Sequence, residues 1–292
     1  MTTPAWPIPA DVKCAEVNGY PMTYEDRGSG TPLVLVHGSL CDYRFWRFQS
    51  EPFAQAHRVI TVSLRHYYPE PWDGVGADFS FTQHADDLAA LIPKLELGKV
   101  HLLGHSRGGA VAIELAKKHP ELLRSLILSD PAAKLEIPET PESAKALAFR
   151  SALYANLRKE VTKGNIEGGT ARFMDDLNGA GAWSRLPRSV QERMIQNVWT
   201  AMVDDPLPLT KDEELRKLTL AILTLTGEKS PPMFSLLLNE MRKRGNFPAP
   251  IVIGSAAHAM NTENPNVFND SVLQFTKKVD DLEFASAHSD GT

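Results

Sequence analysis

The stretch Gly104–Gly108, with the sequence Gly-His-Ser-Arg-Gly, constrains the fold of this chain more than any other. Residues 99–103 before it form a short apolar run typical of a buried strand. Residues 109–119 after it carry an apolar face at helical spacing, which Pro120 ends. A serine on so sharp a strand-to-helix turn has strained backbone geometry, and the first helical N–H groups beside it can stabilise an anion. The pattern predicts that Ser106 is a nucleophile rather than a solvated serine in an ordinary turn.

Strands and helices alternate along much of the chain. Residues 14–17 and 22–26, separated by Asn18-Gly19, predict an antiparallel hairpin, and residues 81–95 predict a helix with one apolar face. Alternation of this kind favours an α/β fold, a mostly parallel central sheet wrapped by helices. The runs predicted as buried parallel strands are residues 33–36, 59–62, 99–103, 126–128, 221–225 and 251–253.

Residues 134–209 differ from the rest because they contain apolar residues at helical spacing and no convincing strand. Since this block stands between two predicted sheet strands, it is interpreted as a helical lid (cap) over the carboxyl edge of the sheet. Residues 12–133 and 210–280 then form the core. Residues 281–292 are predicted to be a disordered tail.

Composition is that of an ordinary globular enzyme, with 292 residues, 42% hydrophobic and 23% charged. A formal net charge of −5 and the lack of a spanning apolar run or a leader-like start predict no nucleic-acid partner and no membrane. Cys14 and Cys41 are too few for a disulfide framework, so a reducing cytoplasm is expected. No metal-binding pattern, phosphate loop or dinucleotide fingerprint occurs, so neither metal nor cofactor is predicted. A small-molecule substrate is the expected partner, and the oligomeric state stays open.

A serine hydroxyl needs a base to accept its proton as it attacks, and histidine is the usual base near neutral pH. Of nine histidines, His258 is predicted for this role because it follows the last predicted strand on a loop of small residues. The other histidines receive other predictions: His37 and His105 a structural role, His101 packing or hydrogen bonding, His57, His84 and His119 the surface, His288 the tail, and His66 the sheet edge near the pocket.

Three motifs in this order resemble those of the α/β-hydrolase superfamily. His37-Gly38-Ser39 resembles its oxyanion loop, residues 104–109 resemble its nucleophile elbow, and His258 before Asn264-Pro265 resembles its late catalytic histidine. The likeness runs from about residue 12 to residue 279, and it implies a cofactor-free hydrolase without specifying the substrate.

Under this interpretation, two backbone N–H groups hold the oxyanion. One belongs to Arg107, directly after the nucleophile, and the other to Ser39, with Leu40 as its neighbouring alternative. The guanidinium of Arg107 either contacts an acidic substrate or forms an ion pair, and the ion pair is favoured.

The acid that orients the histidine departs from the pattern most common in the superfamily. Relatives usually place an aspartate three residues after the glycine that ends the strand at 221–225, whereas this chain has Ser230 there. Some members carry the acid at the end of the preceding strand, where this chain has Asp130. Asp130 is therefore predicted as the acid, with Glu228 as the alternative.

A second departure follows the fourth predicted strand, where residues 65–72 are rich in aromatic residues instead of glycine. Such a loop either grips an apolar substrate or packs in the core, and the sequence does not decide between the two. Leu40, His66 and Tyr67 are predicted to line the substrate pocket.

Together these features predict a serine hydrolase that cleaves a small ester or lactone through an acyl-enzyme. Two alternatives stay open, namely hydrolytic carbon–carbon bond cleavage on the same fold and a receptor that keeps the pocket without turnover. Ser106 argues against dehalogenases and epoxide hydrolases, which use a carboxylate at the elbow.

Overall fold

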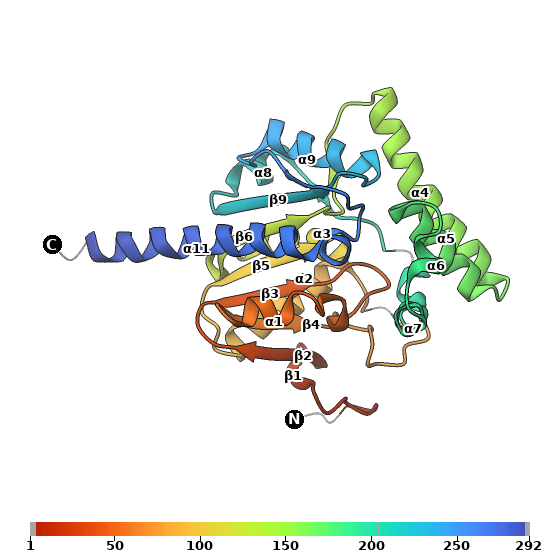
Figure 1. Cartoon of the computed structure of the whole chain (residues 1–292), viewed down its shortest axis with the longest axis horizontal. Helices are drawn as coiled ribbons and strands as arrows, with labels where there is room; N and C mark the ends of the chain where they lie inside the picture. Colours follow the sequence, from red (N-terminus) through yellow and green to blue (C-terminus); the bar gives the residue numbers. More distant parts are fainter. Residues whose placement is uncertain (1–3, 77, 204, 290–292) are drawn as a thin grey trace.

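The computed structural model describes residues 4–76, 78–203 and 205–289. Its centre is an eight-stranded sheet in the order β1-β2-β4-β3-β5-β6-β9-β10 (Figure 1), in which β1 and β2 are antiparallel to their neighbours and all later strands are parallel. This confirms the predicted fold class. The strands are β1 (Lys13–Val17), β2 (Tyr20–Gly28), β3 (Pro32–Val36), β4 (Arg58–Val62), β5 (Val100–His105), β6 (Leu123–Ser129), β9 (Ala221–Gly227) and β10 (Ile251–Ile253).

The central strands are mainly apolar because helices cover both faces of the sheet. On one face, α2 (Phe81–Lys94), α3 (Arg107–Lys118) and α9 (Pro232–Arg244) share a core with side chains such as Val34 and Leu102. On the other face, α1 (Ser50–Ala54) and α11 (Pro265–Ser289) pack against side chains such as Leu35. Alternate residues of one strand therefore enter two separate cores. The short elements around the sheet are η1 (Tyr43–Trp46), η2 (Pro120–Leu122), α8 (Asp212–Lys217) and α10 (Met260–Glu263).

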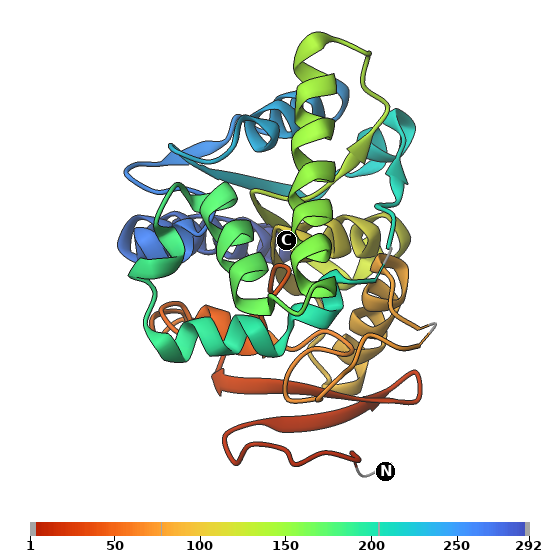
Figure 2. The same ribbon diagram turned by 90° about the vertical axis from the view of Figure 1, so that its right-hand side faces the viewer.

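Residues 134–209 stand between β6 and β9 and are mainly helical. Figures 1 and 2 show their helices gathered at one end of the sheet. They have a hydrophobic core of their own, which includes Leu157, Phe173 and Met194 and also takes in Leu40 and Phe234 from outside the segment. Two short strands that the sequence did not predict, β7 (Lys134–Leu135) and β8 (Leu209–Thr210), pair where the segment begins and ends. The helices are α4 (Pro141–Thr162), α5 (Ile166–Asn178), α6 (Ala182–Arg185), α7 (Arg188–Gln196) and η3 (Val198–Ala201).

The C-terminal region differs from the sequence-based prediction, since residues 281–289 continue α11 as helix instead of forming a disordered tail. The helix projects past the sheet, away from residues 134–209, which are called the inserted segment below (Figure 1). Arg124 on β6 forms ion pairs with Asp280 and Glu283, and Lys277 pairs with Asp281 one turn along the helix. These contacts and the helix-favouring alanines of this stretch explain the extension. Residues 290–292 of the predicted tail lie outside the described residues.

In the part of the chain that the structure describes, no helix combines the length and the apolar character needed to cross a membrane.

Candidate active site

Ser106 occupies a sharp turn between β5 and α3. Its backbone has φ 53° and ψ −114°, a region that residues other than glycine rarely adopt. The neighbouring glycines make this turn possible. A Cβ on Gly104 would lie 2.3 Å from the carbonyl oxygen of Gly108, and a Cβ on Gly108 would lie 2.2 Å from that of Val36. Close packing of three backbone segments thus holds the serine at the carboxyl end of β5.

His258 lies on the loop after β10, at the same edge of the sheet. Its ring is stacked on Phe234 of α9, with the ring centroids 4.3 Å apart. His105, one residue before the serine, is fully buried, and its Nε2–H donates a hydrogen bond of 2.9 Å to the backbone carbonyl of His258. Burial, followed by the nearby His258, holds the pKa of His105 well below its usual value, so that ring is neutral. His105 therefore has the structural role predicted for it.

Asp130 is the carboxylate beside His258. It follows β6 in a left-handed conformation with φ 39°, is completely buried, and accepts a hydrogen bond of 3.1 Å from His258 Nδ1 at Oδ2. The alternative acid, Glu228, is exposed and accepts a hydrogen bond of 2.7 Å from the backbone N–H of Ser255. Of the two candidates, the structure brings Asp130 to the histidine and places Glu228 elsewhere.

Ser230 contributes a contact that sequence reasoning missed. Standing where relatives usually carry the acid, its hydroxyl donates a hydrogen bond of 2.6 Å to Oδ2 of Asp130, the same oxygen that accepts from His258. The hydroxyl also accepts from the backbone N–H of Gly227 at 3.2 Å. Two donors, the Ser230 hydroxyl and His258 Nδ1, thus converge on one carboxylate oxygen of Asp130.

Ser106 and His258 line one cavity, but no hydrogen bond between their side chains is present among the described residues. Hydrogen bonds of this kind are often long in a free enzyme and tighten when substrate binds. The separation therefore does not argue against a serine–histidine pair.

The backbone N–H groups predicted for the oxyanion hole belong to Ser39, which lines the same cavity as Ser106, and to Arg107, the next residue in the chain. In the described part of the chain, neither Ser39 nor Arg107 donates its backbone N–H to a protein acceptor. The peptide that carries the Ser39 N–H is fixed because its carbonyl, on Gly38, accepts 2.8 Å from His37 Nδ1. His37 Nε2 in turn accepts from the Leu64 N–H at 3.1 Å. Burial lowers the pKa of His37 to about 4, so this ring stays neutral and keeps both contacts.

The guanidinium of Arg107 forms an ion pair with Asp205, on the chain that returns from the inserted segment. Both side chains are buried, with relative exposures of 7% and 6%, and the guanidinium lies 4.0 Å from the Phe81 ring centroid. Burial raises the pKa of Asp205, and the charge of Arg107 opposes this shift. The side chain thus has a protein partner, as the favoured interpretation predicts.

Replacing Asp205 by alanine is expected to lower the free energy of unfolding by about 3–5 kcal/mol, because it leaves the Arg107 charge buried without a partner. Chemical denaturation followed by fluorescence measures the change. The control is Asp281→Ala, which breaks the exposed pair with Lys277 and should cost less than about 1 kcal/mol. A similar small loss for both variants would contradict this prediction.

The cavity beside Ser106 has an empty volume of about 790 Å³, including the space at its mouth. Much of its wall is apolar and comes from the inserted segment, through α5 and α7. Leu40 lines it as predicted, whereas His66 and Tyr67 are not among its lining residues. The apolar side chains of the wall are Leu40, Phe45, Phe173, Met174, Leu177, Leu186, Val190 and Met194.

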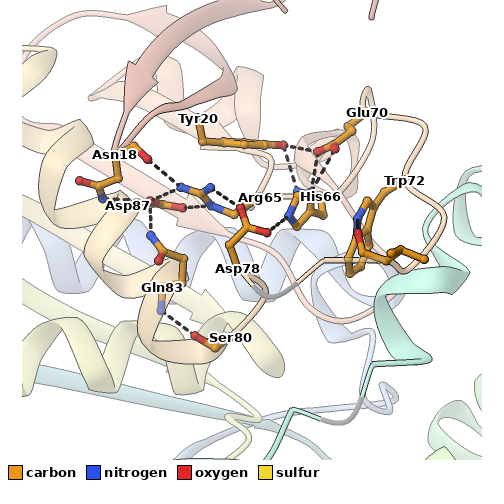
Figure 3. A network of polar contacts seen from close by, with 11 residues as sticks. Asn18, Tyr20, Arg65, His66, Glu70, Trp72, Asp78, Ser80, Gln83 and Asp87 are labelled. Carbon is orange, nitrogen blue, oxygen red and sulfur yellow. Dashed lines mark hydrogen bonds and ion pairs between the residues drawn. The ribbon is translucent and has the colours of Figure 1, made fainter. Parts of the chain in front are cut away.

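The aromatic loop after β4 packs instead beside β2 and α2, through contacts with Tyr20 and His84, which corrects the pocket prediction for two residues. Tyr67 is buried with its ring against His37, at a centroid distance of 4.6 Å. His66 belongs to a polar network, shown in Figure 3, in which its Nδ1 meets Glu70 at 3.0 Å and its Nε2 meets Asp78 at 2.9 Å. The network continues through Arg65, which binds Asp78 and Asp87, and includes Asn18, Tyr20 and Gln83.

The network makes stability depend on pH. Burial opposes the charged His66 ring, but hydrogen bonds and charges from Glu70 and Asp78 outweigh it and raise its pKa. A raised pKa contributes stability below the unfolded value of about 6.5, and this contribution is lost as pH rises through the folded value. The free energy of unfolding should therefore fall over that window, and His66→Gln should flatten the slope. The control His119→Gln, at an exposed ring, should keep it, and equal slopes in all three proteins would refute the assignment.

The predictions for two of the remaining histidines were wrong. His57 and His84 are buried rather than on the surface, because α11 and the chain after β4 cover them. His57, His101 and Asp280 offer ligand atoms within 4.8 Å of one another, a spacing that can hold a metal ion. Protein groups already engage these atoms, however: His57 Nε2 meets Thr276 at 2.9 Å and His101 Nε2 meets Asp280 at 3.1 Å. A structural role accounts for the cluster, in agreement with the packing role predicted for His101.

The fold and the residues at its carboxyl edge define a hydrolase of the α/β class. The profile of the alpha/beta hydrolase family matches residues 33–271, and the chain belongs to that family.

Three known proteins illustrate the likeness. The dihydrolipoyllysine-residue acetyltransferase component of the acetoin cleaving system of Pseudomonas putida is 38% identical over 120 residues, 39% of this chain and 31% of that protein. The chain thus spans about a third of that relative's length. The pimeloyl-[acyl-carrier protein] methyl ester esterase of Aeromonas salmonicida is 27% identical over 87% of this chain and 98% of its own. A solved thermophilic esterase from Thermogutta terrifontis has a TM-score of 0.69 at 26% identity, with 92% and 99% of the chains covered.

Proposed function

We propose that this hydrolase uses Ser106 as its nucleophile and cleaves a small carboxylic ester or lactone through an acyl-enzyme. The observation that carries the proposal is the buried Asp130–His258 contact of 3.1 Å, made at the wall of the cavity that Ser106 enters from its strained turn. An ester with an apolar acyl chain suits the apolar wall. The names of the two esterases among the related proteins support the same reaction class.

In this mechanism the Ser106 hydroxyl attacks the ester carbonyl and passes its proton to His258 Nε2. Asp130 accepts from Nδ1–H, which fixes the tautomer and stabilises the imidazolium. The backbone N–H groups of Ser39 and Arg107 stabilise the oxyanion of the tetrahedral intermediate. The imidazolium then protonates the leaving alcohol, and the acyl group stays on the serine. Water, activated by the same histidine, releases the acid and restores the hydroxyl.

Residues 134–209 act in this proposal as a lid that selects the acyl group, because α5 and α7 supply much of the apolar wall. The lid and the oxyanion loop are coupled, since the hydroxyl groups of Tyr154 on α4 and Ser39 lie 2.9 Å apart. Both cysteines are unpaired in the structure, which fits the expected reducing cytoplasm.

A fluorophosphonate probe tests the proposal, because it labels only a serine that is activated as a nucleophile. The expected result is a single adduct, located by mass spectrometry on the peptide with Ser106, together with turnover of 4-nitrophenyl esters or lactones. An unlabelled protein would favour the receptor alternative. A labelled protein that is inactive on esters and lactones but cleaves a carbon–carbon bond in a diketone would favour the second alternative, hydrolytic carbon–carbon bond cleavage.

A further inference from the structure

Three arginines line the active-site cavity, and they differ in their partners. Arg44 is neutralised, since its guanidinium lies 2.6 Å from the carboxylate of Asp42. It also lies 3.6 Å from the centroid of the Tyr68 ring. Arg47 directly follows η1 and is exposed, and Arg193 lies half-buried on α7. Arg47 and Arg193 differ from Arg44 in their ion pairing.

Among the residues that the structure describes, no carboxylate forms an ion pair with Arg47 or Arg193. Arg47 instead lies over the Phe48 ring, 4.4 Å from its centroid. Arg47 and Arg193 line the same cavity and the same adjoining hollow, and burial, followed by the charge of Arg193, lowers the pKa of Arg47. Two like charges without an anion thus stand on the wall of a largely apolar cavity.

The arginines lie at the end of the cavity away from the serine. Arg44, Arg47 and Arg193 also line an adjoining outer hollow, which Ser106 and His258 do not reach. Of the acidic residues in that hollow, Glu25 forms an ion pair with Arg27, and the charges of Asp11 and Glu51 act on Arg27 as well. A ligand that extends from the serine along the apolar wall therefore meets Arg47 and Arg193, which have no ion-pair partner among the described residues, where the cavity joins the outer hollow.

We propose that Arg47 and Arg193 form an anion-binding subsite for the substrate's acyl chain. The subsite takes a terminal carboxylate or phosphate, while the apolar chain fills the cavity and presents its ester to Ser106. Guanidinium groups suit this task because their planar N–H donors match both anions. The inference rests on the proposed ester hydrolysis and narrows its substrate class to esters with an anionic far end. Because the two arginines belong to the core and to α7, the bound anion also holds the inserted segment against the core.

The experiment compares two series of 4-nitrophenyl esters with increasing acyl length, half-esters of dicarboxylic acids and fatty acid esters of the same length. A third series with an ω-phosphate distinguishes the two anions. At the matching length, kcat/KM for an anionic ester should exceed that of its neutral counterpart by about 10- to 100-fold, the effect of a charge-assisted hydrogen bond. The ratio should shrink with added salt. In Arg47→Gln/Arg193→Gln it should fall to about one.

The matched control is Arg188→Gln on the same helix, because Arg188 pairs with Glu167 and Glu192 and does not line the cavity. This variant should keep the parent ratio. An equal rate for both series at every length, or a preference that survives in the double arginine variant, would overturn the subsite while ester hydrolysis stands.

A binding assay keeps the subsite testable if the protein hydrolyses no ester, an outcome that would overturn the proposed function instead. Calorimetric titration of Ser106→Ala with a dicarboxylate and with the fatty acid of equal length should show tighter binding of the dicarboxylate, and the two arginine substitutions should remove the difference. Equal affinities would reject the subsite independently of turnover.

Discussion

Ser106→Ala is expected to remove nearly all ester hydrolysis and all fluorophosphonate labelling while the protein stays folded. Loss of the nucleophile in a serine hydrolase of this kind lowers kcat by about 10⁶-fold, and only the oxyanion donors and substrate binding remain. The fold should survive because the turn is held by its glycines and by backbone hydrogen bonds. The Ser106 carbonyl, for example, accepts from the N–H groups of Gly109 and Ala132 at 3.0 and 2.8 Å. Alanine preserves each of these contacts.

The measurement is turnover of a 4-nitrophenyl ester by purified protein, with circular dichroism and thermal unfolding to establish folding. Ser235→Ala is the matched control, since that exposed serine on α9 donates only to the Pro232 carbonyl. It should retain the parent rate. A folded Ser106→Ala protein with a substantial fraction of the parent activity would end the hypothesis that this serine is the nucleophile.

Features at the ends of strands were predictable from the sequence. Carboxyl ends of parallel strands share one edge of a sheet, so Ser106 after β5, Asp130 after β6 and His258 after β10 had to approach one another. The same rule does not separate Asp130 from Glu228, because each is the first residue after its strand. Their contacts separate them: Asp130 accepts a hydrogen bond from His258, whereas Glu228 accepts one from the N–H of Ser255.

Features that depend on residues distant in the sequence were not predictable. His57 was expected on the surface because nothing near it in sequence covers it, yet it contacts Thr276, 219 residues later. His66 and Tyr67 follow β4 at the expected edge of the sheet, but the aromatic loop folds toward β2 and α2 and leaves the cavity wall to α5 and α7. No sequence signal marked Arg47 and Arg193, because the subsite proposed for them rests on the lack of an ion-pair partner among the described residues, and such partners are visible only in three dimensions.

Ser230 shows why the acid that orients His258 could not be assigned from the sequence alone. The sequence presents a vacancy at the usual position of the acid, and a serine cannot balance an imidazolium charge. In the fold that serine contacts the proposed acid, with its hydroxyl 2.6 Å from Oδ2 of Asp130. Ser230, at the position where relatives usually carry the acid, is therefore in direct contact with Asp130, the acid proposed here. Substitutions at these two positions can test the assignment.

Asp130→Asn is expected to lower kcat by about 10⁴-fold, because the amide favours the wrong imidazole tautomer and cannot stabilise the imidazolium. Glu228→Gln is the matched control. It makes the same chemical change at the other candidate carboxylate, whose contact is with the Ser255 N–H, and it should cost little. Initial rates across pH measure both effects. Equal losses in the two variants, or a larger loss for Glu228→Gln, would assign the acid to Glu228.

The double variant Asp130→Asn/Ser230→Asp carries the test further, since it moves the carboxylate to the position that most relatives use. The Ser230 hydroxyl already touches the oxygen that binds His258, so an aspartate there brings a carboxylate to within reach of the same ring nitrogen. We expect it to regain about 10- to 100-fold of the activity lost in Asp130→Asn, the contribution of one charged hydrogen bond. Ser230→Ala, which removes one of the two donors to Asp130, should lower the rate only modestly. If the double variant is folded and no faster than Asp130→Asn, then the contact between residues 130 and 230 does not place an acid at His258.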